Sequence, residues 1–318
     1  YTILSASSEN NENKEFLSFL DEEWNYKLSQ SPVYATRMGV KGYETEWRDN
    51  SLEAIKSRVA HSKSILESLK KFNVENLSEV NQLNLRLFTQ LTSNDLEISK
   101  YNRHFLPFGH RGGVQLAHED AEVIPLESYD DFSFWIQRLQ NLDKRIDQNI
   151  TLAEIGLEKG YKPPKVLMDR VYRQIVLQSQ SDVLSNPFYK IFIDLPDSIS
   201  YEDQIILRQE AQKVIKETVI PSYKRLEEFF KKKYLKQSRE TVGLYDIPDG
   251  RKLYEVLAKS FTTTDLSPKE IHQIGLDEVQ RIRGEMEGVI DELKFEGSFK
   301  DFLTFLREDK RFYYDSPE

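Results

Sequence analysis

Apolar residues recur every three or four positions along most of this chain, and this spacing restricts the fold more than any other feature of the sequence. The clearest stripe comprises Phe132, Trp135, Ile136, Leu139, Leu142, Ile146, Ile150 and Ala153. A period near 3.6 residues places such side chains on one face of an α-helix. Glycine and proline number only 13 and 11 in 318 residues. The stripe predicts one long helix, ended by Gly160 and the following Pro163–Pro164 pair.

Further stripes of the same period predict helices along the rest of the chain. They cover residues 13–31, 50–69, 77–99, 164–175, 200–234, 253–257, 267–293 and 298–306. Asn13 is expected to cap the first of these helices, and Pro221 to kink the fifth. Only Tyr189–Leu195 alternates in the manner of a strand. We therefore predict an all-α, multi-helical fold of long antiparallel helices, with at most short extended segments.

The domain organisation follows from where the helical pattern starts. Residues 1–13 are rich in Ser, Asn and Glu, and they predict a flexible leader. Residues 14–318 predict a continuous helical part, which the turn-forming segment after residue 240 could subdivide. The chain starts with Tyr1 rather than Met, so we expect further sequence beyond its ends.

Composition excludes several classes of function. The formal net charge is -9 and the pI about 5.3, which disfavours binding to nucleic-acid phosphates. The chain has no cysteine, so disulfides, thiolate nucleophiles and cysteine-ligated zinc are excluded. No apolar run reaches the roughly 20 residues that a membrane-spanning helix needs. We predict no nucleic-acid partner and no transmembrane span.

Three histidines fall within one glycine-rich segment between residues 101 and 125. His104, His110 and His118 could converge on a metal, with Glu119 or Asp120 completing the ligand set. Their spacing matches no compact metal motif, and loops often carry surface histidines. The segment beginning at His118 also lacks the second histidine of an H-E-x-x-H helix. The residues themselves therefore assign no catalytic group and no metal ligand, and the histidine segment stays an alternative to be tested.

The stretch around His272 carries the strongest local signals. Ser267, Pro268 and Glu270 form a capping-box pattern that predicts a helix start. Gly275 falls on the apolar face of that helix, where a glycine costs on the order of 1 kcal/mol, so we expect something to pack closely against the backbone. His272 lies on the flank of the same face. We interpret it as a half-buried, hydrogen-bonded histidine, with the lining of a substrate cleft as the alternative.

Two sequence blocks resemble a known bacterial family. Residues 243–254 read G-L-Y-D-I-P-D-G-R-K-L-Y, and residues 260–282 read S-F-T-T-T-D-L-S-P-K-E-I-H-Q-I-G-L-D-E-V-Q-R-I. They are similar to a domain-of-unknown-function family whose members are described as lipoproteins and grouped with zinc metallopeptidases, a class of hydrolases. S-P-V-Y-A-T-R-M-G (31–39), G-Y-K-P-P (160–164) and I-P-S-Y-K-R-L (220–226) resemble it too. The resemblance covers the chain from Phe16 onward.

The resemblance implies a helical fold of about twice this length, with an H-E-x-x-P-G-H zinc motif in its second half. This chain contains no such motif, so the family's zinc ligands and catalytic glutamate carry over to no residue here. Only the positions that match the family's recurring pattern can be carried over to this chain. The candidate cleft-lining residues are Tyr254, Thr263 and His272, and the candidate structural signature is Asp249, Gly250, Ser267 and Gly275.

Two functions from different classes follow. On the first, the chain is the N-terminal, non-catalytic half of a zinc-dependent peptidase and forms scaffold and one wall of a substrate cleft. Its partner would then be a peptide substrate of the full-length protein, with zinc bound only when the C-terminal half is present. The alternative is a non-enzymatic, envelope-tethered helical module that binds a peptide or protein. Both imply the bacterial cell envelope or periplasm, with a lipid anchor as one means of attachment.

Overall fold

The computed structural model describes residues 2–314 and 316, with side chains from residue 11 onward. The chain divides into two compact units, Tyr1–Leu253 (unit 1) and Tyr254–Glu318 (unit 2), and each is described by itself. Across the described residues the regular elements are all helices, and only two isolated β-bridges interrupt this pattern. The predicted all-α class is confirmed.

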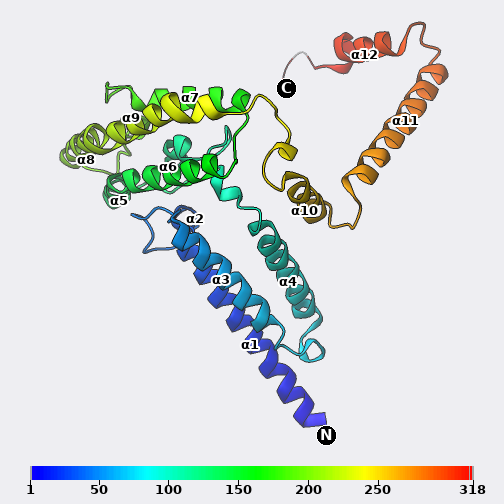
Figure 1. The fold of residues 1–318 in the computed structure, drawn as a ribbon, viewed down its shortest axis with the longest axis horizontal. Coiled ribbons are helices and arrows are strands. Elements are labelled where there is room, and N and C mark those ends of the chain that lie inside the picture. Colours follow the sequence, from blue (N-terminus) through cyan, green and yellow to red (C-terminus); the bar gives the residue numbers. More distant parts are fainter. Residues whose placement is uncertain (1, 315, 317–318) are drawn as a thin grey trace. The chain divides into compact units, whose positions relative to one another are not determined.

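Unit 1 contains nine complete α-helices among its described residues (Figure 1). They are α1 (Thr2–Ser29), α2 (Pro32–Arg37), α3 (Leu52–Leu69), α4 (Glu79–Ser99), α5 (Tyr129–Gln140), α6 (Leu142–Glu158), α7 (Lys165–Ser179), α8 (Tyr201–Val214) and α9 (Ile220–Phe229). A tenth helix, α10 (Gly250–Thr262), begins in unit 1 and ends in unit 2. Short 3-10 and π segments connect several of them.

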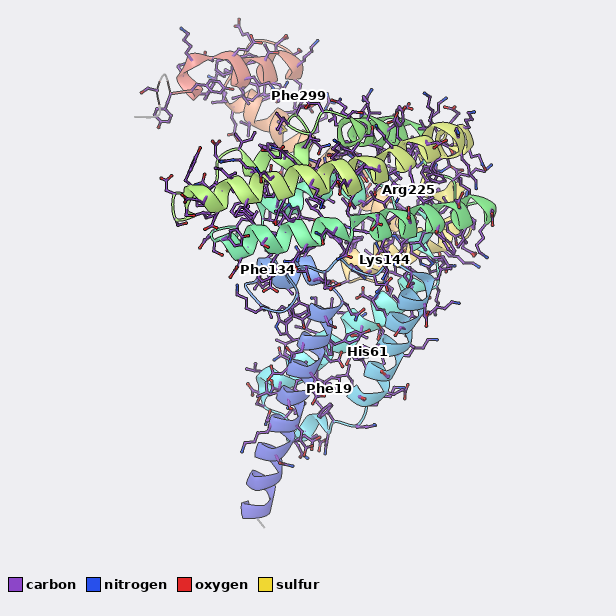
Figure 2. All side chains as sticks on the ribbon, turned by 90° about the vertical axis from the view of Figure 1, so that its left-hand side faces the viewer. Phe19, His61, Phe134, Lys144, Arg225 and Phe299 are labelled. Carbon is purple, nitrogen blue, oxygen red and sulfur yellow. The ribbon has the colours of Figure 1, made fainter. Side chains whose placement is uncertain are left out.

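The larger core of unit 1 lies between helices α5 to α9. Leu139, Ile146, Val171, Ile175 and Leu226 are all fully buried in it, so the stripes seen in the sequence do face inward. Helix α9 packs against both α6 and α7. Arg225 of α9 also bonds Asp147 of α6, and Figure 2 shows Arg225 above the helix that carries Lys144. These helices form one layered body around a continuous core.

A second, smaller core joins α1, α3 and α4. It comprises Phe16, Ile65, Leu69, Leu77 and Leu85. Asn13 lies inside α1 rather than at its start, so its prediction as a helix cap is wrong. Its Oδ1 instead accepts hydrogen bonds from Ser78 N at 3.0 Å and from Asn81 Nδ2 at 2.8 Å, at the start of α4. Asn13 therefore ties α1 to α4.

Helix α1 begins at Thr2, so its backbone is helical through most of the segment predicted as a leader. Tyr1 and the side chains of residues 2–10 lie outside the described part of the chain. The flexibility of the leader stays a prediction.

Two local predictions are wrong. The stripe from Phe132 to Ala153 forms two helices, because Asn141 ends α5 with φ -99° and ψ 8°. Tyr189–Leu195 is not extended: Pro187–Phe192 forms a 3-10 helix that Asn186 caps. The helical run continues through Pro221 as predicted, with a π segment, Ile215–Val219, before it and α9 after it, and the kink at Pro221 stays a prediction. A wider turn leaves room for the proline ring, which clashes with the carbonyl four residues earlier in a regular helix.

Unit 2 consists of the end of α10 followed by α11 (Pro268–Glu292) and α12 (Phe299–Glu308). Phe295, Phe302 and Phe305 form an aromatic cluster with ring centroids 5.2 to 6.0 Å apart. Ile290 and Phe302 are its buried apolar side chains among the described residues of the unit. Most of the apolar face of α11 is exposed, including Val279 at 66% and Leu293 at 62%.

Candidate functional site

A cavity of unit 1 lies among helices α1, α3 and α4, which the small core also joins. Its volume is about 940 Å³. The segment 48–50, the residues just after α4 and two side chains of α6 complete its wall. Figure 2 shows His61, one of the lining residues, in this part of the unit. We refer to it as the α1–α3–α4 cavity.

Arg48 reaches this cavity from a segment that is fixed on both sides. Trp47 is buried, and its Nε1 donates to the carbonyl oxygen of Arg138 at 2.7 Å. On the other side, Asn50 N donates to Gln148 Oε1 at 2.8 Å. The backbone at Arg48 is therefore held against α5 and α6, and its side chain is presented to the cavity.

Arg138 is the reason that this segment is held so firmly. It is fully buried, with its guanidinium 5.6 Å from the ring centroid of Trp47 and 5.9 Å from that of Trp135. Its Nη2 donates to Thr36 Oγ1 and to the carbonyl oxygen of Tyr43, both at 2.7 Å. Burial lowers the pKa of Arg138 to about 10. Arg138 thus links α5 to the 36–47 segment through these contacts.

Arg58 of α3 lies beside Arg48. Its Nη1 donates to the carbonyl oxygen of Asp49 at 2.9 Å and to Gln30 Oε1 at 3.4 Å, which are neutral acceptors. Burial, and then the nearby positive charge of Arg48, lower the pKa of Arg58. Burial also lowers the pKa of Arg48. Arg58 is half-buried and Arg48 is exposed. Two guanidinium groups therefore line one partly solvated corner of the cavity, and each remains charged at neutral pH.

The carboxylate of Asp49, which follows Arg48 in the chain, is occupied by other groups. Asp49 Oδ1 accepts hydrogen bonds from Ser51 N and from Gln148 Nε2, each at 2.8 Å. The hydrogen bond from Ser51 is the main cause that lowers the pKa of Asp49. Within the described part of the chain, Arg48 forms no hydrogen bond or ion pair, and Arg58 forms no ion pair with a carboxylate.

Tyr26, His61 and Glu23 form a second polar group on the cavity wall. The imidazole of His61 stacks on the ring of Tyr26, with centroids 3.5 Å apart. Its Nε2 lies 2.8 Å from Glu23 Oε2. Burial raises the pKa of Tyr26, so its hydroxyl stays protonated and can donate a hydrogen bond. This group supplies a flat aromatic surface next to the two guanidinium groups.

The charge of the cavity is opposite in sign to that of the chain. Lys27, Arg48, Arg58 and Arg103 line it, against the carboxylates of Glu23 and Asp95. Much of the remaining wall is apolar, with Ile55, Val59 and Ile65 from α3 and Phe88, Leu91 and Leu96 from α4. Such a combination can bind a ligand that has both a negative charge and an apolar part.

The three histidines of the glycine-rich segment do not come together. His104 lines the cavity, and burial lowers its pKa. His118 is half-buried elsewhere and accepts a hydrogen bond on Nδ1 from Gln178 Nε2 at 2.9 Å. His110 is not among the residues that line the cavity. A search of the described residues finds no group of three or more His, Asp or Glu side chains that could hold a metal ion. The donor set expected of a zinc site is therefore not assembled by these residues.

The capping box at Ser267 is present. Glu270 N donates to Ser267 Oγ at 3.3 Å, and Ser267 N donates to Glu270 Oε2 at 2.8 Å. Two expectations for the same helix are wrong. His272 is exposed rather than half-buried. A Cβ at Gly275 would meet nothing within 4 Å, so no close packing requires this glycine.

Asp249 and Gly250 have a clear backbone role in unit 1. Asp249 adopts a left-handed conformation with φ 53°. A Cβ at Gly250 would lie 2.0 Å from the carbonyl oxygen of Leu244, so only glycine fits there. Together they turn the chain into α10. In unit 2, Tyr254 is 44% exposed and Thr263 has φ 55° at the end of α10. The cleft-lining role of Tyr254 and Thr263 stays a prediction.

Sequence reasoning missed the residues that distinguish the cavity. Arg48 lies in a non-periodic segment, and Arg58 and His61 sit on a helix whose polar positions resemble an ordinary solvated face. The available signal was the Trp47–Arg48 pair, because a tryptophan in a non-helical segment often anchors it to a core.

Unit 2 has a hollow of its own, about 680 Å³ in volume. It is lined by Met286, Val289, Leu293, Phe295, Phe302, Phe305, Leu306, Arg311 and Phe312. Its one cation, Arg311, already bonds Asp309 at 2.9 Å. We refer to it as the apolar hollow.

Within the described residues, no helix combines the length and the hydropathy that crossing a bilayer requires.

Comparison with known proteins identifies a family and a protein of similar fold. A family model described as "Bacterial protein of unknown function (DUF885)" matches residues 32–318. No curated protein matches the chain. A solved structure described as "the putative lipoprotein from Colwellia psychrerythraea" has a similar fold, with a TM-score of 0.78 and 22% identity. The match covers 97% of this chain and 56% of that one, so this chain spans little more than half the length of that protein.

Proposed function

This chain belongs to the bacterial family of unknown function DUF885, and from that premise we propose that it forms the N-terminal, non-catalytic half of a zinc-dependent peptidase. In this role it provides scaffold and one wall of the substrate cleft. The proposal locates the protein in the cell envelope, in keeping with the description of its structural neighbour as a lipoprotein.

The observation that carries the proposal is the α1–α3–α4 cavity. At about 940 Å³ it falls in the upper part of the range of ligand sites, and it can take several residues of an extended peptide. Its wall combines cationic side chains with an apolar stretch on α3 and α4, as a surface that contacts both a peptide terminus and peptide side chains would. The wall is built on helices that two cores hold in place, which keeps a binding surface rigid.

Zinc has no place in this half of the proposed enzyme. His104, His110 and His118 do not converge, so the residues present do not fit the ion, and no catalytic step is derived through it. We assign the metal to the remainder of the longer protein. The chain's own residues would then bind and orient the peptide.

Metal content and hydrolysis test this proposal together. We expect the purified 318-residue chain to lack stoichiometric zinc and to leave peptides uncleaved. The full-length encoded protein is expected to bind one zinc per chain and to hydrolyse peptides. Tight stoichiometric zinc in this chain, or coding sequence after Glu318 without an H-E-x-x-P-G-H motif, would contradict the proposal. The second result would favour a non-enzymatic envelope module instead.

A further inference from the structure

Arg48 and Arg58 are two like charges that line the same cavity, and within the described chain neither forms an ion pair, although the charge of Asp49 acts on Arg58. Their guanidinium groups are close enough for the charge of one to lower the pKa of the other. Two cations held in a partly solvated corner repel each other, and this repulsion is relieved when an anion binds between them. A guanidinium also offers a planar fork of donors that matches a carboxylate.

The surroundings of the pair narrow the class of anion. Tyr26 and His61 offer a stacked aromatic surface, and Tyr26 can donate a further hydrogen bond. Beyond them the wall becomes apolar along α3 and α4, with Ile55 and Leu91 among its side chains. A small hydrated anion such as phosphate would leave that wall unused. An anion with an apolar group attached would use both parts.

We propose that the α1–α3–α4 cavity binds the free C-terminal carboxylate of an apolar peptide, with Arg48 and Arg58 holding the carboxylate and the wall of α3 and α4 holding the last side chains. This inference names the substrate group for the cleft wall proposed above and rests on that function. It makes Arg48 and Arg58 binding residues with no part in bond cleavage.

The backbone around Arg48 supports this assignment. Buried Trp47 on one side and the Asn50–Gln148 hydrogen bond on the other fix the segment before any ligand arrives. Its side chain has no partner to give up, so binding costs no internal ion pair. A preorganised cation without a partner differs from the surface arginines of unit 2, such as Arg281 and Arg283, which are engaged with neighbouring glutamates.

Calorimetric titration of the 318-residue chain with the tripeptide acetyl-Ala-Leu-Phe tests the proposal. The free acid and the C-terminal amide differ only in the negative charge at the terminus. We expect the acid to bind about tenfold more tightly than the amide, as the loss of one charge-assisted contact pair implies. Arg48→Gln and Arg58→Gln should each weaken binding of the acid about tenfold and leave the amide unchanged.

Arg86→Gln is the matched control, because Arg86 lies on α4, is exposed and does not line the cavity. It should change neither affinity. Arg48→Gln removes a side chain without a partner, so its thermal unfolding should match that of the parent chain and show that the fold is kept. Decanoate is an apolar carboxylate that is not a peptide. Its binding distinguishes a fatty-acid ligand from a peptide ligand.

Equal affinity for acid and amide would overturn the proposal, as would an unchanged acid affinity in Arg48→Gln. Binding of decanoate without binding of the tripeptide acid would overturn the assignment to a peptide. None of these measurements depends on zinc or on turnover, so their failure is distinguishable from failure of the peptidase proposal.

Discussion

The α1–α3–α4 cavity of unit 1 and the apolar hollow of unit 2 are both large, about 940 and 680 Å³, yet their walls differ in kind. The cavity contains unpaired arginines, a histidine–glutamate pair and an aromatic stack. The hollow contains phenylalanine and aliphatic side chains, and its one cation is paired. Charge and polar groups give a site orientation and specificity, whereas apolar area alone gives neither. This difference is why we assign ligand binding to the cavity.

The two units also differ in how their helices are stabilised. In unit 1 the apolar stripes of α5 to α9 are buried between neighbouring helices, and Ile175 is fully inaccessible, whereas Val80, Leu83, Leu87 and Leu91 of α4 are exposed. In unit 2 the apolar face of α11 stays open, and local signals such as the Ser267 capping box specify the helix instead. The same periodic pattern therefore has a different energetic value in each unit.

The largest expected effect contrasts the same substitution in both units. Ile175→Ala should lower the free energy of unfolding by about 2–5 kcal/mol, because it leaves a cavity in the core of α7 and α9. Ile274→Ala, at a position 48% exposed on α11, should change it by less than about 0.5 kcal/mol. Urea unfolding of both variants measures the difference. Equal losses would mean that the face of α11 is covered in solution.

A second contrast uses the two glycines of the family signature. Gly250→Ala should destabilise the chain by about 1–3 kcal/mol or more, because its Cβ would collide with a backbone carbonyl that cannot move freely. Gly275→Ala should stabilise α11 by about 0.5–1 kcal/mol, because alanine is the better helix former and the space is empty. Thermal unfolding reports both signs. A destabilising Gly275→Ala would restore the expectation of close packing at that position.

Loss of the helix cap gives an intermediate effect. Ser267→Ala removes the acceptor for Glu270 N and should cost about 1 kcal/mol. Ser267→Asp keeps an acceptor and serves as the control. Circular dichroism of the two variants during urea unfolding would separate them, and identical curves would show that α11 does not depend on its cap.

The smallest expected effect is a pH dependence at His118. Burial lowers its pKa below the usual 6.5, and the nearby Glu119 and Glu122 only partly oppose this shift. The unfolded chain therefore binds a proton first as pH falls, so this group should lower the free energy of unfolding below about pH 6.5. His118→Gln should flatten that slope. Stability measured between pH 5 and 8 tests this, and an unchanged slope in His118→Gln would refute the assignment.

The helices of this chain could be predicted because their signals are local. Spacing of apolar residues and the cap at Ser267 depend on neighbours within a few positions. The break at Asn141 could not, because the apolar stripe continues through it and tertiary packing decides where the chain turns. Gly275 was misread for a related reason. An apolar face predicts that a helix has a partner, but the pattern does not say which segment provides it.

The cavity depends on contacts that are distant in sequence. The segment at Arg48 is held by Trp47 and by a hydrogen bond from Asn50 N to Gln148 Oε1. Gln148 lies 98 positions further along the chain than Asn50. Arg58 contacts Gln30, and His61 contacts Tyr26 and Glu23. These partners lie in or just after α1, about 30 positions earlier in the chain. The periodic pattern of apolar residues does not predict such long-range contacts. The resemblance to the family pointed to residues 243–282, and the polar cavity lies elsewhere in the sequence.

Hydrogen exchange of the 318-residue chain, with and without acetyl-Ala-Leu-Phe acid, tests the central claim most directly. The account predicts slower exchange in the segment 48–58 and in the lining parts of α1 and α4, with no change in α11 and α12. Arg48→Gln should abolish that protection. Slower exchange confined to α11 and α12 would place binding in the apolar hollow and contradict the account.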